Sequence, residues 1–120
     1  MSTKLKVGII GSGGIAQGCH IPGYRTMPDD CEIIWACDAN EETAKECATK
    51  FDIPKTTTNY HDVLNDPEIG AVSIATPNKF HLQPCLDAFA AGKHVLIEKP
   101  LAMDGNEARQ IVRAANASGK

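Results

Sequence analysis

Short, continuous apolar runs alternate along this chain with segments whose apolar residues recur at helical spacing. A strand buried on both faces reads as a continuous run, whereas a helix that covers one face of a sheet repeats its apolar residues three and four positions apart. Because strands that alternate with helices pair in parallel through right-handed crossovers, we predict a doubly wound α/β fold with strand order 3-2-1-4-5. The predicted strands are Leu5–Ile10, Glu32–Cys37, Lys55–Thr58, Ala71–Ala75 and His94–Ile97.

Residues suited to begin or end a helix lie between these runs. Asn40 is a good N-cap, Pro22 breaks or restarts a helix, and Gly92 is a natural C-terminal stop. Leu82, Leu86 and Phe89 are predicted to face the core. The expected helices run from about Gly13 to His20, from the Asn40 cap to Phe51, from Tyr60 to Asn65, from Phe80 to Ala91, and from an Asp104 cap to about Ser118.

Length and composition exclude several classes of protein. The chain has 120 residues, enough for one domain, and 42% of them are hydrophobic, so a disordered chain is not expected. Its net charge is −3 and no cluster of basic residues occurs, which argues against a nucleic-acid partner. The apolar runs are too short for a membrane span and no secretory segment opens the chain. We therefore expect a cytoplasmic protein with no membrane partner.

The cysteine and histidine patterns give no sign of a disulfide framework or a metal site. The 5 cysteines are odd in number and contain no Cys-x-x-Cys pair, so we expect reduced, buried thiols. The 4 histidines are scattered and never stand four residues apart. We predict no bound metal.

A glycine-rich loop follows the first predicted strand and reads Gly11-Ser12-Gly13-Gly14-Ile15-Ala16. It fits G-x-G-x-x-A between a strand and a helix, as in a Rossmann-type fold. Gly11 permits a tight turn, Gly13 lets a pyrophosphate approach the backbone, and Ala16 lets the helix pack on the sheet. We predict that Gly11, Gly13, Gly14 and Ile15 bind the pyrophosphate of a dinucleotide, the alternative being a purely structural turn.

Asp38 directly follows the second predicted strand and is the candidate for recognising the adenosine ribose. A carboxylate there can accept both ribose hydroxyls and repels a 2′-phosphate. Neither Ala39 nor Asn40 could neutralise such a phosphate. We therefore predict NAD as the cofactor, with NADP as the less favoured one. The alternative role for Asp38 is to cap a helix, and the two roles are compatible.

Two further groups follow the fourth and fifth predicted strands. The carboxyl ends of parallel strands meet at one sheet edge, where α/β folds bind ligands. We expect Thr76, Pro77 and Asn78 near the nicotinamide ribose, although Asn78 could simply cap a helix, and His81 could be either a cofactor or substrate contact or a surface residue. Lys99 can point its ammonium group at a substrate hydroxyl and stabilise a developing alkoxide, the alternative being a solvated surface charge.

Together these residues make the chain resemble the cofactor domain of the glucose-fructose oxidoreductase and inositol dehydrogenase (Gfo/Idh/MocA) family. The resemblance covers nearly the whole chain, and Glu98-Lys99-Pro100 is its most specific motif. The other landmarks are the glycine loop, Cys37-Asp38, Ala75-Thr76-Pro77-Asn78 with His81, and the run from Gly92 to Ile97.

The resemblance implies an NAD(P)-dependent oxidoreductase that transfers hydride to or from a carbinol carbon of a sugar, polyol or related small molecule. It implies that Lys99 is the catalytic lysine, and that Glu98 and Pro100 set the direction of the Lys99 side chain. We also place Glu98 at the cofactor. Residues 1–120 would be the NAD(P)-binding domain. The family's second, α+β domain, which supplies most of the substrate pocket and commonly the homo-oligomer interface, would be absent, and the isolated domain would be inactive.

Two other functions remain open at this point. One is a dinucleotide-binding module that acts as a sensor or a structural unit without redox chemistry, and only Lys99 argues against it. The other is a redox-neutral relative that uses tightly held NAD during glycoside hydrolysis or sugar-to-sugar hydride exchange. The fifth predicted strand, His94–Ile97, also offers an open sheet edge for self-association.

Overall fold

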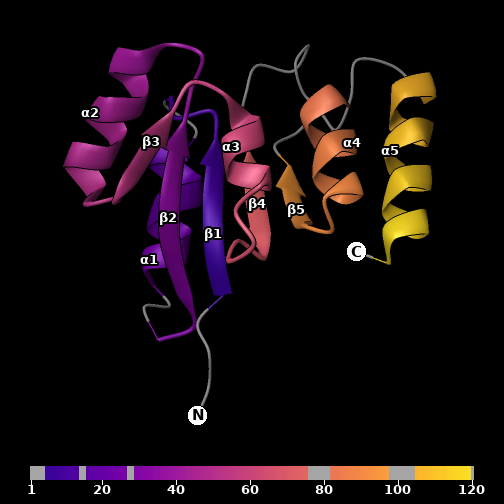
Figure 1. Ribbon diagram of the computed structural model, residues 1–120, viewed down its shortest axis with the longest axis horizontal. Coiled ribbons are helices and arrows are strands. Elements are labelled where there is room, and N and C mark those ends of the chain that lie inside the picture. The colour runs from indigo at the N-terminus through magenta and orange to yellow at the C-terminus, as the bar shows by residue number, and fades with distance from the viewer. Residues whose placement is uncertain (1–4, 14–15, 27–28, 76–81, 98–104, 120) are drawn as a thin grey trace.

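Parallel strands form one sheet in the order β3-β2-β1-β4-β5, which confirms the predicted fold class and strand order. The computed structural model, drawn in Figure 1, describes residues 5–13, 16–26, 29–75, 82–97 and 105–119. The strands are β1 (Leu5–Ile10), β2 (Cys31–Cys37), β3 (Lys55–Thr57), β4 (Ala71–Ile74) and β5 (His94–Ile97).

The helices connect these strands and begin or end close to the predicted residues. A single π-helical turn, η1 (Ala16–His20), continues directly into α1 (Ile21–Arg25), so Pro22 restarts the helix rather than ending it. Asn40 caps α2 by accepting hydrogen bonds from two backbone N–H groups, and Gly92 follows α4 with a φ of 76°. The remaining helices are α2 (Glu41–Phe51), α3 (Tyr60–Leu64), α4 (Leu82–Ala90) and α5 (Gly105–Ser118).

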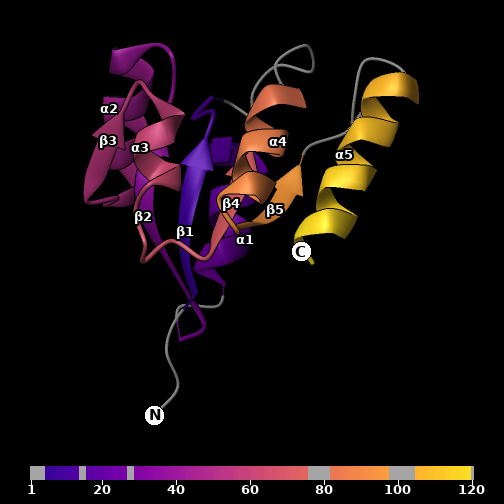
Figure 2. The same ribbon diagram turned by 45° about the vertical axis from the view of Figure 1, so that its right-hand side comes forward.

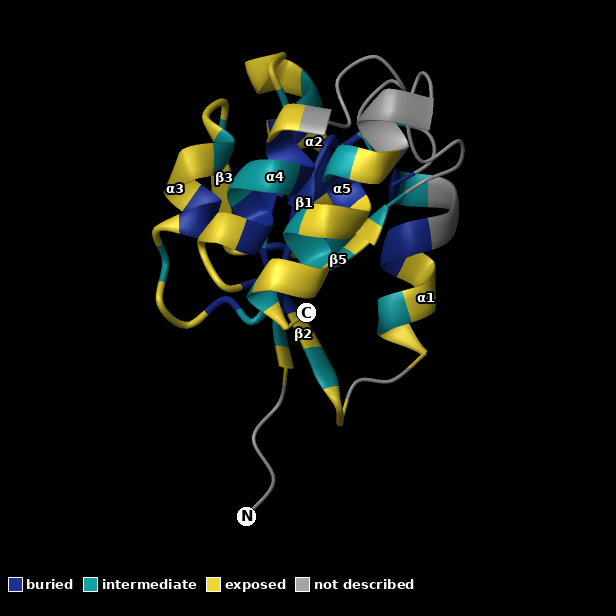
Figure 3. Cartoon of the chain, turned by 90° about the vertical axis from the view of Figure 1, so that its right-hand side faces the viewer, coloured by how far each residue is buried: buried dark blue, intermediate teal, exposed yellow. Residues whose placement is uncertain are grey.

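Two hydrophobic cores lie on opposite faces of the sheet because successive strand residues point to opposite sides. On one face Val7 and Ile9 of β1 pack with apolar residues of η1, α1 and α2. On the other face Ile10 packs with residues of α3, α4 and α5. Figures 2 and 3 show α3, α4 and α5 along one side of the sheet, with the buried residues of β1 enclosed between the layers.

Gly8 lets α3 approach the sheet closely. A Cβ atom built at Gly8 would lie 2.3 Å from Cγ1 of Val63, a distance that real Cβ atoms do not show. Val63 is fully buried, and its β-branched side chain has little rotational freedom. The contact between β1 and α3 therefore requires glycine at position 8.

A buried lysine joins two loops at the amino edge of the sheet. Lys93 is 6% exposed, and its ammonium group donates to the carbonyl oxygens of Asp66 at 3.0 Å and Ile69 at 2.6 Å. Burial lowers the pKa of Lys93, and the nearby Asp66 carboxylate opposes that effect. This contact ties the start of β5 to the loop that leads into β4.

No helix in the described part of the chain has the length and apolar character needed to cross a bilayer.

Candidate functional site

The carboxyl ends of β1, β2 and β4 meet at one edge of the sheet. Ile10, the last residue of β1, is in register with Cys37 of β2 on one side and Ile74 of β4 on the other. Backbone hydrogen bonds continue past the strands, from Gly11 N to Cys37 O at 2.7 Å and from Ala75 N to Ile10 O at 2.8 Å. The residues that follow these strands are thereby brought together.

The described part of the glycine loop has the geometry that a bound pyrophosphate needs. Gly11 has a φ of 92°, a conformation that residues with a side chain rarely adopt. A Cβ atom built at Gly13 meets no other heavy atom within 4 Å, so the backbone there can be approached closely. A dinucleotide fits this loop on both counts.

Ser12 lies at the centre of the loop and anchors it to the end of β2. The residue is fully buried. Its backbone N–H donates to Oδ2 of Asp38 at 3.0 Å, and its hydroxyl donates to the carbonyl oxygen of Cys37 at 3.0 Å. The loop and the predicted ribose-binding carboxylate are therefore joined directly, although they are 26 residues apart.

The Asp38 carboxylate is held in place from two sides. Oδ2 accepts from Ser12, and Oδ1 accepts from the backbone N–H of Asn40 at 2.9 Å. An ionised carboxylate has about four lone-pair positions, so acceptor capacity remains for the hydroxyls of a ribose. Asn40, rather than Asp38, is the N-cap of α2. The half-buried Asp38 is thus free of the capping role that the sequence also allowed.

Gln17 completes the described loop and was not singled out by the sequence motif. Its side-chain amide donates to the carbonyl oxygen of Ser12 at 2.8 Å, and its backbone N–H donates to the carbonyl oxygen of Gly13 at 3.0 Å. A glutamine one residue beyond G-x-G-x-x-A carries no signal by itself. Only the fold of the loop shows what it contacts.

The other predicted site residues lie outside the described part of the chain. Most of them adjoin, in the sequence, elements that the structure describes: β4 ends at Ile74, α4 begins at Leu82 and β5 ends at Ile97. The residues concerned are Gly14, Ile15, Thr76, Pro77, Asn78, His81, Glu98 and Lys99.

Cys31, Cys37, Cys47 and Cys85 are free thiols, and all of them except the half-buried Cys31 are buried, as expected. Burial raises the pKa of Cys37 to about 12, and the negative charges of Asp38 and Asp62 act in the same direction. Burial also raises the pKa of Cys47, whose side chain contacts Ser12, and that of Cys85, to about 11. These groups are protonated at neutral pH and lack the thiolate character of a nucleophile.

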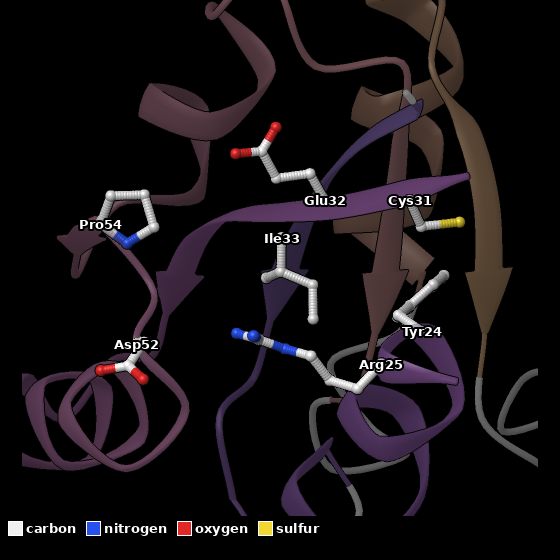
Figure 4. A pocket seen from close by; sticks show the side chains of 7 residues that line it. All are labelled: Tyr24, Arg25, Cys31, Glu32, Ile33, Asp52 and Pro54. Atoms are coloured by element: carbon white, nitrogen blue, oxygen red, sulfur yellow. The ribbon is translucent and has the colours of Figure 1, made fainter. Parts of the chain in front are cut away.

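The described residues include no metal centre, and the hollow at the start of β2 does not bring its carboxylates together. No group of three or more His, Cys, Asp and Glu side chains there could hold a metal ion. A hollow lined by Tyr24, Arg25, Cys31, Glu32, Ile33, Asp52 and Pro54 lies where β2 begins, at the opposite end of that strand from Asp38. Figure 4 shows the Glu32 and Asp52 carboxylates on opposite sides of the β2 ribbon, so they do not converge on one point.

Comparison with known proteins gives one consistent family. The model of the GFO_IDH_MocA oxidoreductase family, described by its NAD-binding Rossmann fold, matches residues 5–120. The chain is 36% identical to levoglucosan dehydrogenase of Pseudarthrobacter phenanthrenivorans over 92% of its length, and 31% identical to inositol 2-dehydrogenase of Salmonella agona over 97%. It spans only 30% and 34% of those two relatives.

Solved structures with bound nicotinamide cofactors have the same fold. Levoglucosan dehydrogenase in complex with NADH and levoglucosan superposes with a TM-score of 0.90 at 33% identity, over 97% of this chain and 33% of that one. A 3-ketoreductase from Actinomadura kijaniata in complex with TDP-benzene and NADP superposes with a TM-score of 0.87 at 28% identity, over 98% of this chain and 37% of that one.

Proposed function

Because this chain belongs to the Gfo/Idh/MocA oxidoreductase family, as its NAD-binding Rossmann domain, we propose that the intact protein is an oxidoreductase acting on a sugar, a polyol or a related small molecule. The proposed reaction transfers hydride between nicotinamide and a carbinol carbon. The relatives named above are dehydrogenases of such compounds, and this chain covers about a third of their length.

The observation that carries the proposal is the direct link between the glycine loop and Asp38. Gly11 makes the turn, Gly13 leaves room for the pyrophosphate, and Asp38 is oriented by N–H groups of Ser12 and Asn40. The glycine loop and Asp38 thus stand together at the carboxyl edge of the sheet, where doubly wound folds bind dinucleotides, which supports their proposed roles with the pyrophosphate and the ribose.

We assign the remaining site residues on the basis of the family motifs. The nicotinamide ring supplies a hydride acceptor or donor when it is bound. Gly14 and Ile15 contact the pyrophosphate, and Thr76, Pro77, Asn78, His81 and Glu98 line the nicotinamide half. Lys99 holds a substrate hydroxyl through its ammonium group and lowers the free energy of the alkoxide that develops there. The hydroxyl proton passes to a histidine or aspartate base, which the family resemblance places in the second domain.

We further propose that Asp38 makes the protein prefer NAD over NADP. The negative carboxylate repels a 2′-phosphate, and the neighbouring side chains offer no compensating positive charge. Ala39 is apolar, and the Asn40 side-chain oxygen is already hydrogen-bonded to Glu42 N and Thr43 N. Structures of this fold are solved with NADH and with NADP, so the fold alone does not select the cofactor, and we propose that the charge beside the ribose does.

The cofactor assignment is tested by calorimetric titration with NADH and, separately, with NADPH. We expect the wild-type protein to bind NADH more tightly, and Asp38→Ala to weaken NADH by about tenfold, because at least one hydrogen bond to a charged group is lost. Asp38→Ala should also reduce the difference between the affinities for NADH and NADPH. Glu46→Ala, which removes an exposed carboxylate from α2, is the matched control. An unchanged preference in Asp38→Ala would place selectivity elsewhere.

The reaction is tested by following reduced-nicotinamide absorbance while a panel of sugars and polyols is offered to the intact protein with NAD. A net dehydrogenase accumulates the reduced cofactor with its substrate. Binding of NADH without any net reduction across the panel would favour a redox-neutral relative or a sensor.

We also propose that the intact protein is a cytoplasmic homo-oligomer without nucleic-acid or membrane partners, and, separately, that the 120-residue domain by itself self-associates through β5. β5 is an outer strand of the described sheet, and Leu96 on it is 51% exposed. An open edge with an exposed apolar side chain can pair with another strand. Sedimentation velocity over a range of protein concentrations checks this point, and a monomer at every concentration would contradict it.

A further inference from the structure

All three polar groups of Ser12 are engaged, and each partner comes from a different residue. Its N–H donates to Asp38, its hydroxyl donates to the Cys37 carbonyl, and its own carbonyl accepts from the Gln17 amide. Ser12 is fully buried, so each of these groups needs a partner inside the protein. Of the three partners, only Gln17 belongs to η1, the helical turn that follows the glycine loop.

The carbonyl of Ser12 and the N–H of Gly13 belong to the same peptide unit. In a planar trans peptide the C=O and N–H bonds point in opposite directions. When the Gln17 amide holds the Ser12 carbonyl on its side at 2.8 Å, the Gly13 N–H must point to the other side. An added Cβ atom at Gly13 meets nothing within 4 Å, so the space beside this peptide is open.

This orientation matters for an anionic ligand. A phosphate is stabilised by N–H groups that point toward it and repelled by a carbonyl oxygen that does so. Rotation of the Ser12–Gly13 peptide would turn the Ser12 carbonyl oxygen toward the ligand in place of the Gly13 N–H. We infer that Gln17 is a positioning residue for the dinucleotide pyrophosphate, because its side-chain amide fixes the Ser12–Gly13 peptide with the N–H facing the ligand. The inference rests on the proposed function, since it assumes that the loop binds a pyrophosphate.

Gln17 and Asp38 therefore act on the two sides of the same loop residue. Asp38 holds the Ser12 N–H and also recognises the ribose, whereas Gln17 contacts the carbonyl side only. The two residues should differ in which ligands they affect. Loss of Asp38 weakens any ligand that contains the adenosine ribose, and loss of Gln17 weakens only ligands that contain the pyrophosphate.

The test compares two probes, NADH and adenosine, because adenosine has the ribose without the pyrophosphate. Calorimetry gives the Kd for NADH, and ligand-observed NMR gives the weaker Kd for adenosine. Gln17→Met keeps the length of the side chain but cannot donate, and we expect it to raise the NADH Kd about fivefold and to leave the adenosine Kd within about twofold. Gln17→Glu places an acceptor against the Ser12 carbonyl and near the phosphates, so its NADH Kd should rise by more than about tenfold.

Gln110→Met is the matched control, because Gln110 is a half-buried glutamine on α5, away from the loop. It should leave both Kd values unchanged. Thermal unfolding followed by circular dichroism accompanies each variant. Gln17→Met should still unfold cooperatively, but at a lower midpoint than the wild-type protein, because the buried Ser12 carbonyl loses its partner. The titrations are therefore run well below that midpoint.

Each departure from this pattern has a distinct meaning. If Gln17→Met binds NADH as tightly as the wild-type protein does, the inference is wrong and the proposed function stands. If Gln17→Met weakens adenosine as much as NADH, Gln17 has a general structural role and the inference is again wrong. If the wild-type protein binds no NADH, the proposed function itself fails and the role of Gln17 fails with it.

Discussion

Replacement of Lys99 by alanine is expected to lower kcat of the intact enzyme about a hundredfold or more, because removal of one preorganised group that stabilises a developing oxyanion has an effect of that size. The Kd for NADH should stay within about threefold of the wild-type value, since the proposed ammonium contact is with substrate rather than cofactor. Reduced-nicotinamide absorbance at saturating substrate gives kcat, and calorimetry gives the Kd.

Lys50→Ala serves as the control for loss of a lysine, because Lys50 is exposed on α2. Lys99→Arg separates charge from shape, since arginine keeps the positive charge but presents a planar group in place of a compact one. Wild-type turnover in Lys99→Ala would remove Lys99 from the mechanism. A loss of turnover that merely followed a loss of NADH affinity would instead make Lys99 a cofactor contact.

Gly8→Ala is expected to destabilise the fold by about 3 kcal/mol, the upper part of the range for an overpacked core. The added methyl group would lie 2.3 Å from Cγ1 of Val63, and neither the central strand nor the buried helix residue can move away freely. Urea unfolding followed by circular dichroism measures the free energy of unfolding.

Two further variants identify the cause. Gly23→Ala makes the same chemical change in α1, where the added methyl group meets nothing within 4 Å, and it should leave stability unchanged or raise it slightly. Val63→Ala removes the clashing atom. The double variant Gly8→Ala/Val63→Ala should therefore be more stable than the sum of the two single changes predicts. Strict additivity would show that the close approach at Gly8 is not what destabilises the single variant.

Much of the fold could be predicted because hydrophobic period and turn residues are local signals. β1 and β5 have the predicted bounds, and β2 begins at Cys31 where the prediction began at Glu32. The inward face of α4 was predicted less well. Leu86 is only half-buried, whereas Pro84 and Cys85 are buried together with the predicted Phe89. A short helix that packs against both β5 and α5 buries a wider face than a single stripe of large residues indicates.

The candidate site could be located from the sequence, but its internal contacts could not. The glycine loop and Asp38 were placed at one edge because parallel strands share that edge. The hydrogen bond between Ser12 and Asp38 depends on the register of β1 against β2, which no local pattern encodes. The Gln17 amide and the buried ammonium of Lys93 satisfy backbone carbonyls whose positions exist only in the folded chain.

The strand order has a consequence for how the chain acquires its structure. β1 is made first, yet it lies at the centre of the sheet, between β2 and β4. Its first partner begins at Cys31 and its second at Ala71, and all the pairs are parallel, so no hairpin can form early to shield it. During synthesis the apolar run Val7–Ile10 therefore has no strand partner until β2 has left the ribosome, and one of its two edges stays open until β4 follows. Non-local pairing of this kind folds slowly and leaves an apolar segment exposed to aggregation until its partners arrive.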